Sequence, residues 1–461
     1  MSNRTHFSSR IGFIAAAAGS AVGLGNIWKF PYETAQNGGG AFFFVYLLCI
    51  LLVGLPVMIA ELTLGRHAQA NPWGAYHKIG GSSWAWVGGL GVICGIMILS
   101  FYNVVAGWSF GYFLQIGFGD LLAAGDHKAY FGEFTKNILP IMLYALLFMG
   151  LTTYVVGRGV KKGLERAATT LMPVLLVLLL GLIAYALTLE NAWDGVAYYL
   201  SFHPEKLNLS VINSAMGHAF FSLSLGMGGL ITYGSYLNKK ENLVRSATVV
   251  TLADTGVAFL AGLLMLPLVF TLGQDPGMSG PGLAFVTLPS IFASIGPVAG
   301  KIVGAGFFLL LTLAALTSTI SLLETPVAYL IDEKKWSRNR AVVSMGLLIF
   351  GLGIPTLLSY GAVPSLGNIS YAGGTHTFLD LVADIFSEAA LPFGGLMLSL
   401  FVVYRWKMAG FESEIQEGFA GYKDHWISIY VNLSLRYLAP IFLGLIFLSN
   451  ILEKFFNIHL F

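Results

Sequence analysis

Charged side chains are scarce in this sequence. Asp, Glu, Lys and Arg make up only 10% of its 461 residues, whereas 56% of the residues are hydrophobic. The mean hydropathy is +0.75. A soluble globular domain carries far more charge than this, so that class is excluded. The composition is typical of a protein that crosses a membrane several times.

Cysteine is also rare, and the net charge is small. Cys49 and Cys94 both lie in apolar stretches, which favours a packing role over a disulfide or a metal site. The formal net charge of +2 gives no support to nucleic-acid binding. The sequence contains no nucleophile motif, phosphate-binding loop or cluster of metal ligands. We therefore expect neither an enzyme nor an organic cofactor.

Hydrophobic stretches of about 20 residues, the length that crosses a bilayer as a helix, recur about eleven times. They cover about residues 11–32, 40–64, 84–118, 137–155, 167–189, 211–236, 243–272, 298–331, 341–359, 375–405 and 426–453. The sequence therefore predicts an all-α polytopic membrane protein, with a single transmembrane domain over residues 1–461 that lies in the lipid bilayer.

Basic residues predict the orientation of these helices, because cytoplasmic loops keep an excess of Lys and Arg. With the N-terminus inside, nineteen of the 25 Lys and Arg residues fall on the cytoplasmic side and five fall outside, while Lys29 lies within the membrane. An odd number of spans leaves the C-terminus outside. We predict a multi-pass protein of the cell (plasma) membrane with a cytoplasmic N-terminus and an extracellular C-terminus.

The first span is interrupted near its middle by the segment 19–26, whose sequence is GSAVGLGN. Glycine and asparagine weaken a helix, and an unwound backbone is tolerated in a membrane only around a protein-lined cavity. Glycines that serve close helix packing are the alternative. Packing requires neither Asn26 nor Lys29, and ionisable groups inside a membrane usually face a pathway. The pattern favours a solute site at mid-membrane.

The sixth span contains a second interruption, FFSLSLGMGG at residues 220–229. The two broken spans occupy equivalent places if spans one to five and six to ten form two repeats. Paired broken helices point to the binding site of a secondary transporter. The repeats would cover about residues 11–189 and 211–405, followed by an additional helix at about 426–453.

Polar residues in the seventh and eighth spans suggest a cation. Asp254 lies deep in the seventh span, where a carboxylate needs a cation or a proton. Thr317 and Ser318 lie in the eighth span. Their hydroxyls bond either to their own backbone or to a hard cation such as sodium.

These features together resemble the neurotransmitter:sodium symporter family, and in particular its bacterial amino-acid branch. The resemblance runs from about Arg4 to the end of the eleventh span. It is carried by GSAVGLGN at 19–26, WKFP at 28–31, NGGGAF at 37–42, Glu61 with Gly65 and Arg66, and SLSLG at 222–226. It implies two inverted five-helix repeats and sodium-coupled uptake by alternating access.

The resemblance also implies two sodium sites between the broken helices and their neighbours. The first would be formed by the substrate carboxylate, the carbonyl of Ala21 and the side chains of Asn26, Ser222 and Asp254. The second would be formed by carbonyls of Gly19, Val22 and Ala314 and by the hydroxyls of Thr317 and Ser318.

An amino acid would bind beside the first sodium site. Its carboxylate would meet the amides of Leu24 and Gly25 and the hydroxyl of Tyr102. Monoamine transporters of the family carry aspartate at the position of Gly23, so glycine favours an amino acid. The implied substrate contacts are Ala21, Leu24, Gly25, Ile98, Tyr102, Phe221, Ser222, Ser224, Met227, Ser318 and Leu322.

The apolar wall and the adaptable side chain of Met227 predict several hydrophobic L-amino acids as substrates, aliphatic and aromatic. A selective pocket for small aliphatic residues is the alternative. Animal members of the family use chloride near the first sodium, whereas a fixed carboxylate is common in bacterial members. With Asp254 in place, we predict no chloride requirement.

The resemblance places a gate on each side of the site. On the outer side Lys29 would pair with Asp380, and on the cytoplasmic side Arg4 would pair with Asp332 near Tyr236. We expect Glu61 to bridge helices. In the fifth span, Gly163 and Pro173 have the family's spacing for local unwinding, and an ordinary proline kink is the alternative.

Other transport classes fit less well. A channel would show a polar stripe along a pore, whereas the polar groups here concentrate at one depth. A proton-coupled amino-acid transporter of related fold usually has a base in place of the second sodium site, and Thr317 with Ser318 argues against it. The sequence leaves the order of substrate preference, the transport stoichiometry and the oligomeric state open.

Overall fold

The structure is a computed structural model that describes residues 6–271 and 282–458. Most of these residues are helical. Their only sheet is an antiparallel hairpin in which β1 (Ile369–Tyr371) pairs with β2 (Gly374–His376). In the same ranges, nine helices are long and apolar enough to cross a membrane, and one bent helix pair makes a tenth. The predicted all-α membrane class is confirmed.

The first predicted span is broken where its sequence predicts. Helix α1 (Arg10–Ala21) ends at the glycine-rich segment, and the chain continues as the π-helical segment η1 (Gly25–Lys29) and α2 (Phe30–Gln36). The two halves are bent by 53°. The sixth span is broken too, because six residues of irregular backbone, 223–228, separate α11 (Leu209–Ser222) from α12 (Gly229–Gly234). The predicted breaks in spans one and six are therefore present.

The remaining spans lie close to the predicted ranges, several of them with π-helical segments labelled η. Spans two to five are α3 (Gly40–Cys49), η2 (Ile50–Gly54) and α4 (Leu55–Ala68); α6 (Ser82–Gly117); α8 (Ile138–Gly157); and η4 (Val160–Glu165) with α9 (Arg166–Ala186). Spans seven to nine are α13 (Leu243–Thr271), α15 (Pro297–Lys334) and α16 (Arg338–Leu358).

The last two spans contain several π-helical segments. Span ten comprises α18 (Phe378–Ala383), η7 (Asp384–Ala389), α19 (Ala390–Leu400), η8 (Phe401–Lys407) and α20 (Met408–Gln416). Span eleven comprises α21 (Trp426–Leu433), η10 (Ser434–Leu438) and α22 (Ala439–Phe456). Such segments change the direction of the side chains that follow them, which matters below for Glu388.

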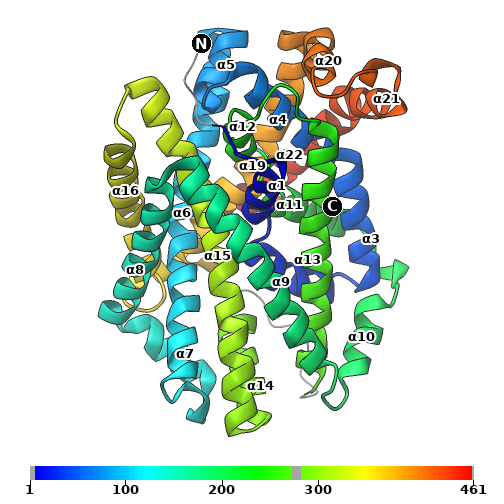
Figure 1. The fold of residues 1–461 in the computed structure, drawn as a ribbon. Coiled ribbons are helices and arrows are strands. Elements are labelled where there is room, and N and C mark those ends of the chain that lie inside the picture. The colour runs from blue at the N-terminus through cyan, green and yellow to red at the C-terminus, as the bar shows by residue number, and fades with distance from the viewer. Residues whose placement is uncertain (1–5, 272–281, 459–461) are drawn as a thin grey trace.

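Short helices connect the spans at both ends of the bundle. They are α5 (Pro72–Gly80), η3 (Leu121–Ala123), α7 (His127–Lys136), α10 (Ala192–Leu200), η5 (Pro204–Lys206), η6 (Leu283–Thr287), α14 (Leu288–Ser294), α17 (Pro364–Gly367) and η9 (Tyr422–Asp424). Figure 1 shows α5 and α20 at the end of the bundle where the N-terminus lies, and α7 and α14 at the opposite end.

The broken helices lie in the middle of the bundle. Helix α1 packs against α9, α13 and α15, and α15 also packs against α6. Figure 1 shows α1 and α11 near the centre of the view, with α6 and α15 on one side and α3 on the other. Ala16, Ala17 and Ala18 of α1 are buried, and their small side chains allow the neighbouring helices to approach closely. This packing places both breaks inside the protein, away from lipid.

Candidate functional site

The break in the first span exposes backbone groups that side chains then satisfy. The amide of Gly23 donates to Asn26 Oδ1 at 2.9 Å, and the amide of Leu24 donates to the hydroxyl of Tyr102 at 2.8 Å. Buried backbone donors need such partners because no water reaches them in a membrane. Asn26 thus stabilises the unwound segment that it belongs to.

The break in the sixth span contains three residues in the left-handed region. Their φ angles are 55° at Ser224, 81° at Gly226 and 73° at Gly228. Ser224 Oγ donates to the carbonyl of Ser20 at 2.9 Å, so it links the two breaks directly. The amide of Gly226 donates to Glu61 Oε1 at 2.7 Å. Glu61 therefore bridges α4 to the broken helix, as its sequence position predicts.

Asn26, Ser222 and Asp254 come together at the junction of the two breaks and α13. Asn26 Nδ2 donates to Asp254 Oδ1 at 2.7 Å and to Ser222 Oγ at 3.0 Å. Ser222 Oγ donates to Asp254 Oδ2 at 2.9 Å. Asp254 is 0% exposed, and both partners are neutral. A buried carboxylate with neutral partners attracts a cation, so the predicted first sodium ligands have a suitable arrangement.

The second predicted group of oxygen ligands lies between α1 and α15. Thr317 Oγ1 is 2.9 Å from the carbonyl oxygen of Ala314 and 3.3 Å from that of Val22. Ser318 Oγ is also 3.3 Å from the Val22 carbonyl oxygen. A Cβ atom on Gly19 would lie 3.3 Å from Thr317 Cβ, so all five predicted residues meet here. Carbonyl and hydroxyl oxygens suit a hard cation.

Neither group is a site for a transition metal. In the described ranges, no three or more His, Cys, Asp or Glu side chains are placed to hold a metal ion. The oxygen donors at the breaks are instead backbone carbonyls, hydroxyls, one amide and one carboxylate. Such a donor set suits an alkali cation that must bind and leave again.

A small cavity of about 20 Å³ lies beside the two breaks. Its lining includes ten of the eleven predicted substrate contacts, namely Ala21, Gly25, Ile98, Tyr102, Phe221, Ser222, Ser224, Met227, Ser318 and Leu322. Ser20 and Gly23 also line it, and sequence reasoning did not include them among the contacts. The eleventh predicted contact, Leu24, instead lines a larger neighbouring cavity.

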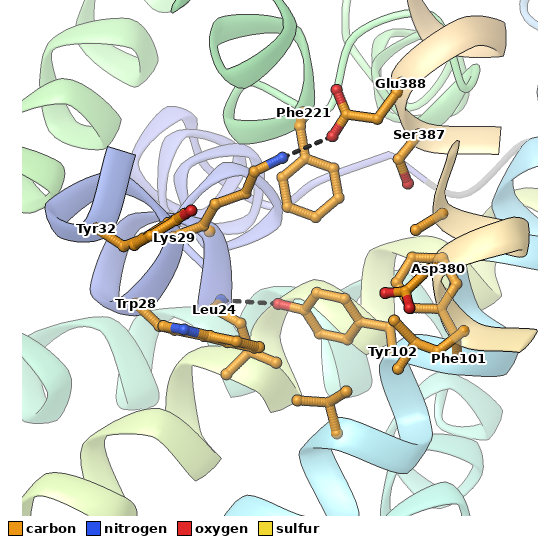
Figure 2. A pocket seen from close by; sticks show the side chains of 14 residues that line it. Leu24, Trp28, Lys29, Tyr32, Phe101, Tyr102, Phe221, Asp380, Ser387 and Glu388 are labelled. Carbon is orange, nitrogen blue, oxygen red and sulfur yellow. Dashed lines mark hydrogen bonds and ion pairs between the residues drawn. The ribbon is translucent and has the colours of Figure 1, made fainter. Parts of the chain in front are cut away.

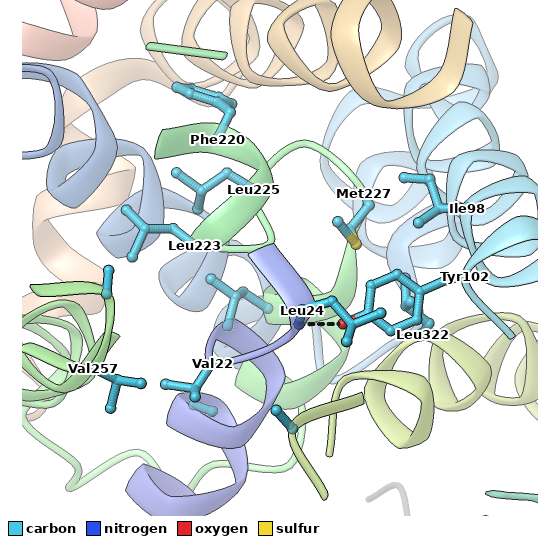
Figure 3. Packing of buried hydrophobic residues seen from close by; sticks show 14 of the residues in the cluster. Val22, Leu24, Ile98, Tyr102, Phe220, Leu223, Leu225, Met227, Val257 and Leu322 are labelled. Atoms are coloured by element: carbon cyan, nitrogen blue, oxygen red, sulfur yellow. Dashed lines mark hydrogen bonds between the residues drawn. The ribbon is translucent and has the colours of Figure 1, made fainter. Parts of the chain in front are cut away.

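The volume of this cavity limits what it can hold in the conformation seen here. A space of this size accommodates about one water molecule. Figure 3 shows Ile98, Tyr102, Met227 and Leu322 gathered on one side of the first break, where they fill the apolar part of the site. A hydrophobic amino acid therefore fits only if these side chains or the broken helices move apart.

The larger cavity, of about 210 Å³, is lined by Trp28, Phe101 and Tyr102 among others, and we call it the vestibule. Lys29 Nζ lies 2.6 Å from Glu388 Oε1 and 5.6 Å from the centre of the Phe221 ring. Figure 2 shows this ion pair at one end of the vestibule, with Asp380 on another side. Lys29, predicted to form a gate, thus pairs with Glu388, a carboxylate to which no role was assigned from the sequence.

The predicted pairing of Lys29 with Asp380 is wrong in this structure. Asp380 Oδ2 accepts hydrogen bonds from the amide and hydroxyl of Thr377, at 2.9 and 2.8 Å, in a capping box that begins α18. The π-helical segment η7 follows at once and ends beyond Glu388, which turns that side chain toward Lys29. Asp380 lines the same vestibule without binding the lysine.

The predicted inner gate is only partly described. Arg4 lies outside the described residues, so its pairing with Asp332 is untested; Asp332 Oδ2 accepts a hydrogen bond from the amide of Asn71 at 2.8 Å. Tyr236, placed near this gate by the sequence, donates its hydroxyl to Glu324 Oε1 at 2.6 Å. Arg338 also binds Glu324, at 2.5 Å. Sequence reasoning missed this network because its members are distant in sequence.

Three comparisons relate this chain to known proteins. A family model described as the Sodium:neurotransmitter symporter family matches residues 4–133 and 128–458. The chain is 39% identical over 451 residues to an uncharacterized sodium-dependent transporter of Bacillus subtilis (strain 168), covering 96% of this chain and 97% of the relative. It is 34% identical over 426 residues to an uncharacterized sodium-dependent transporter of Methanocaldococcus jannaschii, covering 87% of this chain and 82% of the relative.

A solved structure is similar over almost the whole chain. It is the crystal structure of MhsT in complex with L-phenylalanine, with a TM-score of 0.88 and 44% sequence identity. The alignment covers 97% of this chain and 100% of that chain. The two chains therefore share their overall fold.

Proposed function

Because the chain belongs to the sodium:neurotransmitter symporter family, we propose that it takes up hydrophobic L-amino acids together with sodium by alternating access. That it is a sodium-dependent transporter of the membrane, and not an enzyme, follows from the family itself. The substrate class, the two sodium sites and the independence from chloride are the proposed part.

The observation that carries the proposal is the buried cluster of Asn26, Ser222 and Asp254. It joins the break of the first span, the break of the sixth span and α13 through hydrogen bonds of 2.7 to 3.0 Å. A sodium ion bound there would share ligands with the carboxylate of an amino acid in the adjacent cavity. Shared coordination couples the two binding events, because each partner then binds more tightly in the presence of the other.

The lining of the cavity supports an amino acid with a hydrophobic side chain. Gly23 offers no carboxylate to an amine, and Ile98, Phe221, Met227 and Leu322 form an apolar part of the wall. The related MhsT was solved with L-phenylalanine. We propose that aliphatic and aromatic amino acids both enter, because methionine and the broken helices can adapt to different shapes.

A proton-coupled transporter is the second candidate. Among the residues that the structure describes, no basic side chain lines the cavity beside the breaks. The hydroxyls of Thr317 and Ser318 each lie 3.3 Å from the carbonyl oxygen of Val22. That arrangement supports a second sodium rather than a fixed positive charge.

The direct test is uptake by the purified protein in liposomes. We expect an inward sodium gradient to drive uptake of both leucine and tryptophan, and potassium to drive neither. Replacing chloride by gluconate is expected to leave the rate unchanged, because Asp254 already supplies negative charge beside the first sodium site. Equal uptake in potassium would reject sodium coupling, and loss of uptake in gluconate would reject the role of Asp254.

The outer gate gives a second test that compares two carboxylates in the same vestibule. Glu388→Gln is expected to favour the outward-open form, because it removes the partner of Lys29. A charge-assisted hydrogen bond stabilises the closed form, but partial exposure of the pair to solvent reduces this free energy. We therefore expect the labelling rate in the vestibule to rise about fivefold. Asp380→Asn is expected to change labelling less than about twofold, since Asp380 does not bind the lysine.

Labelling would be measured at Val105→Cys, which lines the vestibule, in a chain that also carries Cys49→Ala and Cys94→Ala. An impermeant thiol reagent is added from the predicted extracellular side. A larger effect of Asp380→Asn than of Glu388→Gln would show that the ion pair with Glu388 does not control this gate.

A further inference from the structure

A buried carboxylate on the fifth span holds the chain just before the first broken helix. The amide of Ser8 donates to Glu165 Oε2 at 2.8 Å, and the hydroxyl of Ser8 donates to Oε1 at 2.5 Å. The hydroxyl of Ser9 donates to Oε1 at 3.2 Å. Glu165 is only 6% exposed. Three hydrogen bonds thus connect one carboxylate to two consecutive residues that lie over 150 positions away.

The carboxylate also lies on the first turn of α1. A Cβ atom on Gly12 would be 1.9 Å from Glu165 Oε1, so only glycine permits this contact. Ser9 is the N-cap of α1, and its side chain accepts a hydrogen bond from the amide of Gly12. A negative charge at this end of a helix is favourable because the first amides point toward it. Glu165 therefore fixes both the start of α1 and the segment before it.

Glu165 lies where the helix of its own span is irregular. It is the last residue of the π-helical segment η4, and α9 after it contains Pro173, which lacks a backbone donor. Within η4, a Cβ atom on Gly163 would lie 2.1 Å from the carbonyl oxygen of Val155, so this turn packs tightly against the end of α8. A change in the winding of η4 would move the Glu165 side chain away from α1.

We propose that Glu165 is a positioning residue of the transport cycle, which couples unwinding of the fifth span to release of α1. Helix α1 and the residue that caps its C-terminal end carry the carbonyls of Gly19 and Val22, which belong to the proposed second sodium site. While Glu165 holds Ser8 and Ser9, α1 stays against α9 and α15. When η4 unwinds, these hydrogen bonds break and α1 is free to move. The inference rests on the alternating access proposed above.

An ion pair near the same segment provides a control. Arg10 Nε lies 3.1 Å from Glu241 Oε1, and Glu241 belongs to the connection between α12 and α13 rather than to the fifth span. If any contact that holds the N-terminal segment had the same effect, Glu241→Gln and Glu165→Gln would change the labelling rate equally. The proposal requires that they differ.

The experiment measures how readily a thiol between α1 and α15 is labelled from the predicted cytoplasmic side. Ser321 is 3% exposed, and Ser20 of α1 donates a hydrogen bond to its hydroxyl at 2.8 Å. Ser321→Cys, in the Cys49→Ala and Cys94→Ala background, therefore reports separation of the two helices. In sodium without substrate, we expect Glu165→Gln to be labelled about tenfold faster than the parent, which corresponds to loss of one charge-assisted bond.

Three further variants separate this role from a general loss of structure. Glu165→Asp keeps the charge and is expected to give an intermediate rate, and Glu241→Gln is expected to stay within about twofold of the parent. Ser8→Ala removes one hydroxyl donor. Combined with Glu165→Gln, it should raise the rate less than the product of the single effects, because both changes break the same contact. Monodisperse size-exclusion profiles check that the variants are folded.

The outcomes distinguish the proposal from the function on which it rests. If sodium slows labelling of the parent but Glu165→Gln matches the parent, sodium control of access stands and the role of Glu165 is rejected. Equal acceleration by Glu165→Gln and Glu241→Gln would also reject it. If sodium has no effect on labelling of the parent, the sodium-coupled alternating access proposed above fails instead.

Discussion

Asp254→Asn is expected to remove sodium-driven uptake. Asparagine has nearly the same size and can still bond to Asn26 and Ser222, but it carries no charge. The carboxylate is 0% exposed, so its attraction for a bound cation is weakly screened. Two opposite charges in contact at a protein-like dielectric interact by several kcal/mol, so we expect the sodium affinity to fall on the order of 100-fold.

Radioactive sodium binding to the purified protein, measured with and without leucine, tests this expectation. Asp194→Asn in the exposed part of α10 makes the same chemical change far from the breaks and is expected to bind sodium like the parent. Thermal melting of both variants controls for folding. Sodium affinity in Asp254→Asn that equals the parent would mean that this carboxylate does not hold the ion.

The sequence predicted the centre of the site better than its edges. Asn26, Ser222 and Asp254 were expected together because the resemblance to the family implies that they share a sodium site, and the structure joins their side chains at 2.7 to 3.0 Å. Breaks depend on glycine and local hydrogen bonding, which a sequence displays directly.

The partner of Lys29 was harder to predict because it depends on helix register. A π-helical segment adds a residue to a turn, and η7 shifts every side chain between Asp384 and Ala389 relative to a regular helix. The capping box was visible in the sequence, since Thr377 and Asp380 have the spacing of an N-terminal cap. That pattern would have assigned Asp380 to its own helix and left Glu388 for Lys29.

Contacts between distant segments were missed for a different reason. The bonds from Ser8 and Ser9 to Glu165, and from Tyr236 and Arg338 to Glu324, join residues whose neighbours in the sequence show no shared pattern. The volume of the cavity beside the breaks is likewise a property of packed side chains. About 20 Å³ remains after Met227 and its neighbours are in place, and no count of residues gives that value.

Gly23→Ala is expected to lower substrate affinity strongly while leaving the fold intact. A Cβ atom at this position would lie 2.4 Å from Ser318 Oγ and 2.6 Å from the hydroxyl of Tyr102. Both side chains would have to move, and both are proposed to contact the substrate or the second sodium. Overpacking of this kind costs about 1 to 3 kcal/mol, so we expect the KM for leucine to rise about tenfold or more.

Gly181→Ala is the matched control, because a Cβ atom there meets no atom within 4 Å and alanine favours the helix. Its KM is expected to equal that of the parent, and its melting temperature is expected to equal that of the parent or exceed it slightly. If Gly23→Ala kept the KM of the parent, the close approach of Gly23 to Tyr102 and Ser318 would not shape the substrate site. If instead it melted much earlier than Gly181→Ala, Gly23 would serve the packing of α1 more than recognition of the substrate.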